Sequence, residues 1–517
     1  MNLKKISLFL NLHKEILFIS LLYFITRLIN LGALPIFNDE AIYLDWGWRE
    51  ISESGNLYYS LYDGKQPLLM WIFGIFEKIL SDPLIAGRLV SVITGFITFL
   101  GIYLLAKKLF DKKAAIIAIT LYVFNSLFLF FDRQALMESA ICAVGIWAFY
   151  FLFEFIHKNS KKYAMSLGLV LGIGLFIKST AFIFVIASFF LLIYSYFKAK
   201  NKSEFIKNCG IICLLIISTD LLLIINPEFW STLGMNQRYV YSISDIFRLP
   251  VINWLTNIFL NIKILIVYLN PFVLISSFAG IFLFVKRKKQ DYSLLLIWIV
   301  TLLALEIILT KESSQRYLVS LLPVLILPAS YIFSLILRKS LLWGRIFLIV
   351  TILISSAYMF FQITNPYFYI KNTQKFSGDQ SLNYISGYTS GYGVNEAVDL
   401  INNASTNNKI YLATALNTGN PESAMQIYFA KDEMVRTTYL DESLLASQME
   451  IVRNVDCLKF DRDIYFISRN NDLAGFERFF EKVTEFKKPE GKEVIGFYKL
   501  KKNCKGKYLD LIPKKDN

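Results

Sequence analysis

The sequence predicts an all-α bundle of about eleven membrane-spanning helices, followed by a small α/β domain. Two observations indicate a membrane protein: 55% of the 517 residues are hydrophobic, and the mean hydropathy is +0.48. Soluble globular proteins rarely reach such values. The third observation is a change of composition near residue 365, after which the chain becomes polar. We therefore expect two domains, a membrane domain at 1–364 and a soluble domain at 365–517.

Membrane-spanning helices need about 20 apolar residues. Eleven runs approach this length, and two interrupted runs at 67–80 and 251–266 suit helices that lie at the membrane surface or enter it halfway. The first run lacks a small-residue cleavage site, so we expect a retained span rather than a signal peptide. The eleven predicted spans are 14–34, 84–106, 114–131, 136–156, 163–177, 181–197, 206–225, 270–285, 292–310, 318–337 and 341–361.

Clusters of lysine and arginine fall on one side of the membrane when eleven spans are threaded in order. Because cytoplasmic loops carry an excess of these residues, the N-terminus is expected in the cytoplasm. We therefore expect a multi-pass protein of the cell (plasma or inner) membrane. Because the number of spans is odd, residues 365–517 are expected on the outer side of that membrane. These clusters also explain the net charge of +14, and no basic stripe with interleaved aromatics indicates a nucleic-acid partner.

The polar tail alternates between strand-like and helix-like patterns, which predicts an α/β domain. The expected strands are 409–414, 434–440, 463–468 and 493–500, and the expected helices are near 394–403, 421–430 and 472–482. Cys457 and Cys504 lie in this tail and could pair in an oxidising compartment. The chain has only two histidines, which excludes a histidine-rich metal site.

The first outer loop, residues 35–66, carries adjacent carboxylates at Asp39 and Glu40. They come just past the end of the first span, at the boundary between lipid and water. A lipid-borne substrate and a water-soluble acceptor can meet there. Asp39 could instead cap the helix expected to begin near Ala41, because aspartate is a good N-cap residue.

Six basic residues lie at the outer ends of spans and so oppose the orientation bias of the chain. Charged groups in such places usually face a bundle interior or a wet cavity. Six cations converging on one outer cavity would bind an anion, and a phosphate in the headgroup layer is the obvious ligand. The six are Arg27, Lys65, Arg88, Arg133, Lys178 and Arg316.

Carboxylates come from the same side, namely Asp39, Glu40, Asp132 and Glu138. A carboxylate can accept the proton of an attacking hydroxyl, and neighbouring cations can stabilise a departing phosphate. The combination predicts group transfer from a phosphate-activated donor.

Each of these residues also has a structural interpretation. Arg27 could pair with a buried acid, Lys65 could precede a helix that starts at Pro67, and Arg133 could pair locally with Asp132. Lys178 could be a snorkelling turn lysine. Arg316 and Tyr317 could form an interfacial anchor pair.

At these residues the chain resembles the GT-C class of membrane glycosyltransferases. The segment TRLINLGALPIFNDEAIY (26–43) is most similar to the protein O-mannosyltransferase family and the aminoarabinose lipid A transferase group, in which an arginine precedes an Asp-Glu pair. The Lys-Pro-Pro helix start of that family resembles Lys65-Gln66-Pro67, with Gln66 replacing one proline. Other similar positions are Arg133 with Glu138, the glycine-rich segment ending at Lys178, Arg316-Tyr317, and the segment 388–401.

The resemblance implies inverting, single-displacement transfer from a polyprenyl-phosphate sugar donor to a lipid, glycan or protein acceptor. Asp39 would be the general base, and Glu40 would orient the acceptor, bind a cation or share the base role. Arg27, Lys65, Arg133, Lys178 and Arg316 would hold the phosphate and its lipid carrier, with Arg88 the least defined member of the set. No cofactor is required by this scheme. A divalent cation near Glu40 stays an open alternative, because some relatives of this class use one.

Three other function classes are alternatives. A transporter would also have broken helices and intramembrane charges, but its charges should lie mid-span. A flippase or ligase that handles whole lipid-linked glycans would share the carrier-binding cations. A scaffold protein would leave the outer cations unexplained.

Overall fold

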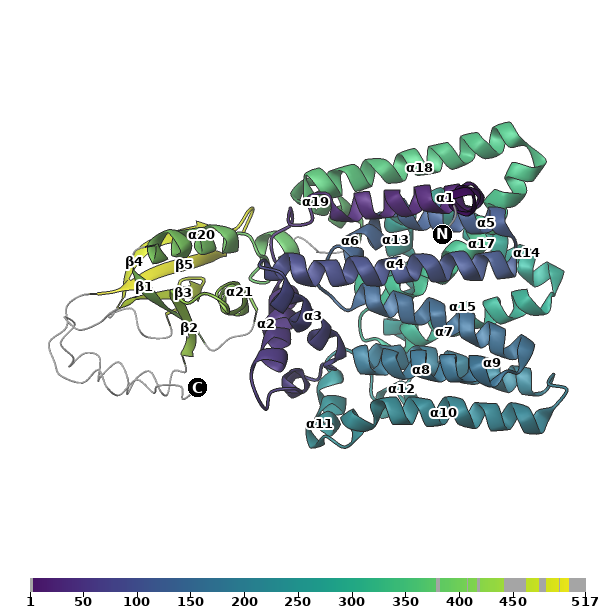
Figure 1. Ribbon diagram of the computed structural model, residues 1–517, viewed down its shortest axis with the longest axis horizontal. Coiled ribbons are helices and arrows are strands. Elements are labelled where there is room, and N and C mark those ends of the chain that lie inside the picture. Colours follow the sequence, from purple (N-terminus) through teal and green to yellow (C-terminus); the bar gives the residue numbers. More distant parts are fainter. Residues whose placement is uncertain are drawn as a thin grey trace.

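The computed structural model describes residues 3–377, 382–406, 408–415, 419–440, 462–473, 480–491 and 493–501. Figure 1 shows a bundle of long helices and, beyond one end of it, a smaller sheet with its own helices. Two short helices, α2 (Asn38–Ser52) and α3 (Leu68–Ile79), lie between these parts. We call the end of the bundle that faces the sheet the sheet end.

Long apolar helices form the bundle, as the sequence predicts. Many present large apolar side chains on the bundle exterior, for example Leu214, Leu222 and Phe282, because lipid replaces water around a membrane helix. The helices are α1 (Leu3–Leu28), α4 (Pro83–Leu109), α5 (Lys112–Val123), α6 (Ser126–Asp132), α7 (Glu138–Lys158), α8 (Lys161–Ile177), α9 (Phe182–Tyr196), α10 (Lys202–Ile224), α13 (Val251–Tyr268), α14 (Pro271–Arg287), α15 (Gln290–Leu309), α17 (Leu322–Lys339) and α18 (Leu341–Thr364).

The predicted count of eleven spans is not confirmed. Within the described part of the chain, eight helices are long and apolar enough to cross a membrane, or nine if the bent pair α5 and α6 is one span. The predicted spans at 163–177 and 270–285 are helices of 17 residues each, α8 and α14. The chain is a multi-pass membrane protein, and its spans are less uniform in length than hydropathy alone suggests.

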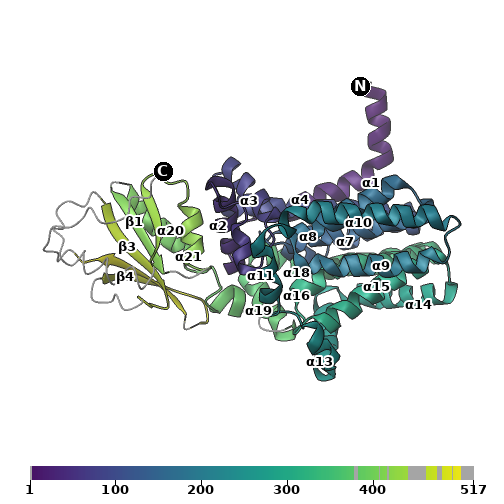
Figure 2. The same cartoon turned by 90° about the horizontal axis from the view of Figure 1, so that it is seen from below.

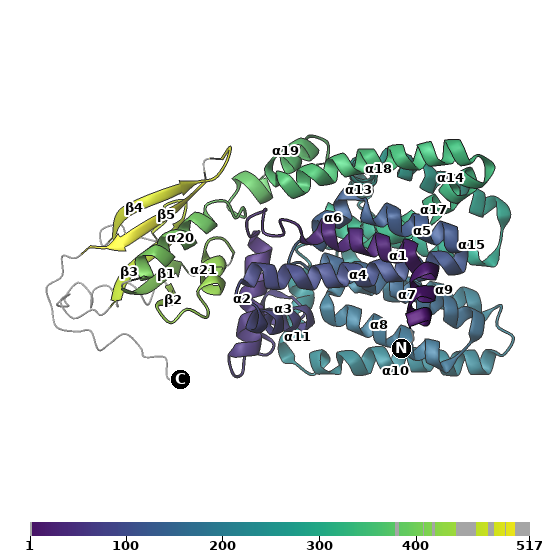
Figure 3. The same ribbon diagram turned by 45° about the horizontal axis from the view of Figure 1, so that its top comes forward.

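The helix at 251–266, expected at the membrane surface, is α13, which is long and apolar enough to count as a span. Figure 2 shows it projecting from the side of the bundle at a steep angle to α9 and α15. Its buried residues are mainly polar or aromatic, and Asn257 and Asn261 face the end of α15. The other interrupted run, 67–80, is α3, which packs beside α2 at the sheet end (Figure 3).

The helix break between α5 and α6 bends the chain by 66°. Asn125 caps α6, since its Oδ1 accepts hydrogen bonds from Leu127 N and Phe128 N, at 3.0 and 3.1 Å. Its Nδ2 donates to Tyr268 O at 2.9 Å, which ties the break to α13. The break lets α6 deliver Asp132 and Arg133 to the sheet end, directly before α7 begins.

The C-terminal sheet has five strands in the order β2-β1-β3-β5-β4. The pairs β1–β2 and β1–β3 are parallel, whereas β3–β5 and β4–β5 are antiparallel. The strands are β1 (Lys409–Ala415), β2 (Val435–Leu440), β3 (Arg462–Arg469), β4 (Phe480–Lys487) and β5 (Val494–Leu500). The predicted α/β character is confirmed, with helices α20 (Val394–Ser405) and α21 (Glu422–Tyr428) close to their expected positions.

One predicted element of the tail is wrong in part. Of the helix expected at 472–482, residues 474–479 lie outside the described residues, whereas residues 480–482 belong to β4, an edge strand whose residues after Phe480 are exposed or half-buried. Alternating lysine and glutamate suit such an edge and also resemble a solvated helix face. Cys457 and Cys504, the proposed disulfide partners, lie outside the described residues.

Candidate active site

A continuous line of four charged side chains lies at the sheet end of the bundle. Arg316 Nη1 donates to Asp39 Oδ2 at 2.5 Å, and its Nε donates to Glu138 Oε1 at 2.8 Å. Lys178 Nζ donates to the same Glu138 oxygen at 2.9 Å. The structure therefore joins four of the residues predicted from the sequence, although they come from four separate segments.

Helix ends supply all four side chains. Asp39 lies in the first turn of α2 and Glu138 is the first residue of α7, where the helix dipole favours a negative charge. Lys178 directly follows α8, and Arg316 belongs to the short helix α16 (Gln315–Leu318). Because the ends of several helices meet here, the charges gather without any one of them lying in the middle of a span.

The four side chains differ in their access to solvent. The Glu138 side chain is 1% exposed, whereas those of Asp39 and Arg316 are 26% and 28% exposed. Glu138 therefore pairs with Lys178 and Arg316 on the buried side of the cluster, whereas the carboxylate of Asp39 lies on its accessible side. Of the two acids, Asp39 is the one that a substrate can reach.

Lys65 approaches the same cluster from the loop before α3. Burial is the main factor that lowers the pKa of its ammonium; Asp63 opposes this effect and the charge of Lys178 adds to it. The adjacent Gln66 accepts a hydrogen bond from Ser179 N at 3.1 Å, which fastens the Lys65 loop to the turn after Lys178. The ammonium lies 5.1 Å from the centroid of the Tyr239 ring, at a cation–π distance.

Tyr43 forms part of the wall beside Asp39. It is four residues further along α2 and therefore shares a helix face with Asp39. Burial is the main factor that raises the pKa of its phenol, and the charge of Asp39 raises it further. The hydroxyl therefore stays protonated at neutral pH and can donate a hydrogen bond in the site.

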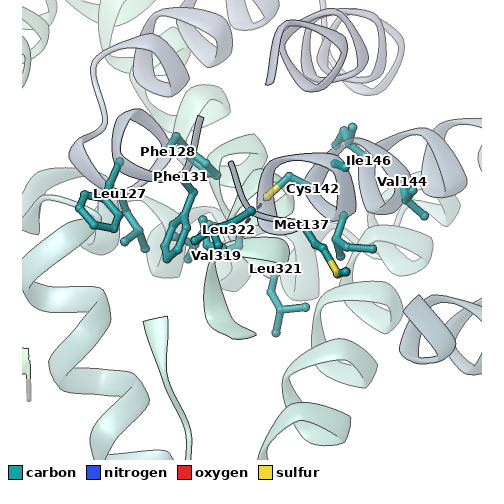
Figure 4. Packing of buried hydrophobic residues seen from close by; sticks show 14 of the residues in the cluster. Leu127, Phe128, Phe131, Met137, Cys142, Val144, Ile146, Val319, Leu321 and Leu322 are labelled. Atoms are coloured by element: carbon teal, nitrogen blue, oxygen red, sulfur yellow. Dashed lines mark hydrogen bonds between the residues drawn. The ribbon is translucent and has the colours of Figure 1, made fainter. Parts of the chain in front are cut away.

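Apolar packing supports the cluster from within the bundle. Figure 4 shows the start of α7, around Met137 and Cys142, against the residues that follow Arg316, including Val319 and Leu322. Cys142 Sγ donates to Val319 O at 3.4 Å, and all four residues are buried. This close packing fixes the segments that carry Glu138 and Arg316 relative to each other.

The cluster has a surplus of positive charge. Arg316, Lys178 and Lys65 are cations, and Asp39 and Glu138 are the facing carboxylates. Asp63 also lies near Lys65, but it is itself paired with Arg238 at 2.8 Å. A site with one unmatched cation, part of it accessible, is suited to an anion such as a phosphate.

Glu40 does not face this cluster, although the sequence places it next to Asp39. Its carboxylate is completely buried and forms a two-point ion pair with Arg88, at 2.9 and 2.7 Å. Phe37 N and Ala135 N also donate to its two oxygens. The expectation that Glu40 shares the base role or contacts the acceptor is therefore not supported by its position, and Arg88 is likewise internal.

Arg27 and Arg133 are also used inside the protein. Arg27 pairs with Asp132 at 3.3 Å, and both side chains are buried. The guanidinium of Arg133 donates to four carbonyl oxygens at the end of α1, among them those of Ile29 and Asn30, as a C-terminal cap. The expected convergence of six cations is therefore wrong for three of them, and the convergence involves Lys65, Lys178 and Arg316.

The residues do not fit a divalent cation at Glu40. Every oxygen of that carboxylate already accepts hydrogen bonds, one pair of them from a guanidinium. Among the described residues, no group of three or more histidine, cysteine, aspartate or glutamate side chains is arranged to hold a metal ion.

Comparisons with known proteins agree with this architecture. The structure aligns with ArnT from Cupriavidus metallidurans, with a TM-score of 0.59 and 10% identity, over 94% of this chain and 97% of that one. The chain has the fold of the GT-C membrane glycosyltransferases. The resemblance predicted from the loop around Asp39 is confirmed at this level.

Further matches to this GT-C fold extend the comparison. ArnT from the same organism bound to undecaprenyl phosphate aligns with a TM-score of 0.55 and 11% identity, over 94% of this chain and 97% of that one. An Archaeoglobus fulgidus oligosaccharyltransferase in complex with Zn and sulfate aligns with a TM-score of 0.51 and 13% identity, over 88% and 67%.

A sequence-family comparison points the same way for part of the GT-C fold. Residues 64–222 match the family model described as dolichyl-phosphate-mannose-protein mannosyltransferase. This segment contains Lys65, Glu138 and Lys178, three members of the charged cluster. No curated protein matches the chain in sequence. The fold and the matched segment are thus each similar to those of membrane glycosyltransferases.

Several residues of the site were not identified from the sequence. Tyr43 could have been found from its spacing of four residues from Asp39. Gln66 interrupts the expected Lys-Pro-Pro pattern, and its hydrogen bond to Ser179 N gives the substitution a structural role. Tyr239 carries no sequence signal, because it comes from a loop far along the chain.

Proposed function

We propose that the protein is an integral membrane glycosyltransferase that moves a sugar from a polyprenyl-phosphate donor to an acceptor on the outer face of the cell membrane. The observation that carries the proposal is the line Asp39–Arg316–Glu138–Lys178, in which an accessible carboxylate stands beside cations. Such a site can bind a phosphate and accept a proton at adjacent positions.

The reaction is an inverting single displacement. An acceptor hydroxyl, or a phosphate oxygen, attacks the anomeric carbon of the sugar, and Asp39 takes up the proton when the acceptor is a hydroxyl. The bond between that carbon and the donor phosphate breaks at the same time. The released polyprenyl phosphate carries away the bonding electron pair, and its negative charge is stabilised by Lys178, Arg316 and Lys65.

Glu138 and Glu40 support this reaction without contacting the substrates. Glu138 orients Arg316 and Lys178, which would otherwise repel each other. Glu40 fixes the start of α2 through Arg88 and Ala135 N. Both contributions are a matter of placement, since enzymes lose rate when reacting groups move by about an ångström.

Transfer from a panel of radiolabelled polyprenyl-phosphate sugars in membranes tests the proposal. We expect the wild type to label an acceptor with at least one donor, and Asp39→Asn to reduce the rate by about 10²–10⁴-fold, the usual range for a general base. Asp399→Asn, on the exposed face of α20, is the matched control and should retain full activity.

The outcomes separate the alternatives. Equal labelling by the wild type and Asp39→Asn would remove Asp39 from the chemistry. If the wild type transfers sugar from none of the donors, the result would instead favour a transporter or flippase of lipid-linked sugars. Reconstituted vesicles would then be tested for movement of the labelled lipid across the bilayer.

A further inference from the structure

The segment just before Asp39 is held by the C-terminal part of the chain. Asn38 N donates to Thr389 O at 3.0 Å. Asn420 N donates to Asn38 Oδ1 at 2.9 Å, and Asn420 Nδ2 donates to Ile36 O at 2.9 Å. The same Nδ2 also donates to Thr389 O at 3.1 Å, so one side chain links the backbone at Ile36 with the backbone at Thr389.

Two glycines of the C-terminal part allow this close approach. A Cβ atom on Gly391 would lie 2.0 Å from Ile36 O, and one on Gly419 would lie 1.8 Å from Asn38 Oδ1. Gly419 also has a φ of +109°, which side chains rarely adopt. The backbone itself therefore packs against residues 36–38, with no room for a side chain between them.

Asn420 is in turn anchored within its own domain. Arg469 Nε donates to Asn420 O at 3.2 Å, and Arg469 Nη2 pairs with the buried Glu422 at 2.8 Å. Lys488 Nζ donates to the carbonyls of Gly387, Tyr388 and Ser390, which fixes the loop that carries Thr389. The donor Asn420 and the acceptor Thr389 O, which face segment 36–38, are thus held by Arg469 at the end of β3 and by Lys488 directly after β4.

Asp39 consequently lies between two clamps. On one side Asn38 is buried and bonded to the C-terminal part, and on the other Glu40 is buried and bonded to Arg88 and Ala135 N. Of these three consecutive residues, only Asp39 is partly exposed. Residues that lock their neighbours in this way set the direction in which the intervening side chain points.

We propose that Asn420 is a positioning residue that holds Asp39 in its reactive orientation, so that the C-terminal α/β domain is a structural component of the active site. The inference rests on the proposed function, because it assigns Asn420 to the same transfer. Asn420 acts through Asn38 and Ile36 and does not contact the substrates.

The test uses the full-length protein with Asn420→Leu, which keeps the approximate size of the side chain and removes its donor group. We expect kcat to fall about 10–100-fold because Asp39 is displaced, while KM for the donor stays within about twofold. Hydrogen exchange at the amides of residues 36–41 should become faster in the same variant. Asn403→Ala, on an exposed face of α20, is the matched control and should change neither quantity.

The possible failures are distinguishable. Unchanged exchange at residues 36–41 would overturn the inference whatever the activity, since no clamp would exist. Normal transfer by both the wild type and Asn420→Leu would overturn the inference and leave the proposed function intact. General unfolding would lower the apparent kcat without changing KM, so kcat is normalised to the folded fraction of each variant. Faster exchange throughout the chain, instead of at residues 36–41 alone, would indicate general unfolding and count against a positioning role. Absence of transfer by the wild type would overturn the proposed function, and with it the positioning role for Asn420.

Discussion

Asp39 Oδ2 and Arg316 Nη1 lie 2.5 Å apart although 277 positions separate the two residues in the chain. The contact joins the first turn of α2 to the short helix α16, which precedes α17. Arg316 also bridges to Glu138, so a single guanidinium connects the accessible acid with the buried one. Because Arg316 contacts both acids, we expect its substitution to lower the transfer rate more than substitution of the other cations of the site.

Substitution of Arg316 should show whether its forked shape matters in addition to its charge. Arg316→Lys retains a positive charge, but one ammonium cannot reproduce two donors in a rigid fork. We expect a decrease in kcat of about 10²–10³-fold, comparable to the loss of one preorganised donor. Transfer rates at saturating donor measure this. Arg248→Lys, at a highly exposed position, should have no effect; equal rates for the two variants would argue against the bridge.

Lys178 should contribute mainly to binding of the carrier phosphate. Removal of its charge by Lys178→Gln deletes one charge-assisted hydrogen bond, worth about 1.5–3 kcal/mol. Binding of polyprenyl phosphate in detergent solution should therefore weaken about 10–100-fold in a calorimetric titration. Lys207→Gln, an exposed lysine of α10, serves as the control. Unaltered affinity in Lys178→Gln would place the phosphate elsewhere.

Glu40 should be needed for stability more than for contact with substrate. Glu40→Gln leaves the fully buried Arg88 charge without its carboxylate, and breaking a buried pair in this way costs about 3–5 kcal/mol. The melting temperature of the purified protein in detergent should fall clearly. Glu53→Gln, at the exposed end of α2, should change stability by less than about 0.5 kcal/mol. A stable, inactive Glu40→Gln protein would instead indicate a direct chemical role.

The packing of α2 should become less stable as the pH rises. Burial raises the pKa of Glu50 to about 8, from an ordinary value of 4.5. Because the folded-state pKa is raised, the stabilising contribution is complete below about pH 4.5 and is lost as the pH rises through about 8. The upper limit of this contribution to the free energy of unfolding is about 5 kcal/mol.

Thermal unfolding between pH 5 and pH 9 measures this dependence. Glu50→Gln should flatten the profile, and the remainder should come from Glu77, whose pKa burial also raises. Glu53→Gln is again the control, since the side chain of Glu53 is 37% exposed whereas Glu50 is buried. A profile for Glu50→Gln as steep as that of the wild type would contradict the assignment.

Much of the candidate site could be predicted because charge beside an apolar span is itself a signal. Lys178, Glu138 and Arg316 all stand out at span ends, and Asp39 follows the first span. The same signal also selected Arg27, Arg88 and Arg133, which form buried pairs or caps. Hydropathy cannot separate these uses, because a cation that binds a ligand and one that binds a buried carboxylate occupy the same kind of position.

The partners that decide between the two uses are far apart in sequence. Arg27 meets Asp132 across 105 positions, and Arg88 meets Glu40 across 48. The contacts of Asn420 with Ile36 and Asn38 span more than 380 positions, and no local pattern announces them. The edge strand β4 was missed for a different reason, since its exposed charges resemble the solvated face of a helix.

The sequence by itself determined the membrane class, the polar α/β tail and the carboxylate loop around Asp39, because hydropathy and local periodicity are properties of neighbouring residues. Only the tertiary structure decided that Asp39 pairs with Arg316 at a partly exposed site, whereas the adjacent Glu40 pairs with Arg88 in the protein interior. The physical reason is that a charge must be compensated wherever it is buried. Which residue supplies the compensation depends on how distant helices meet.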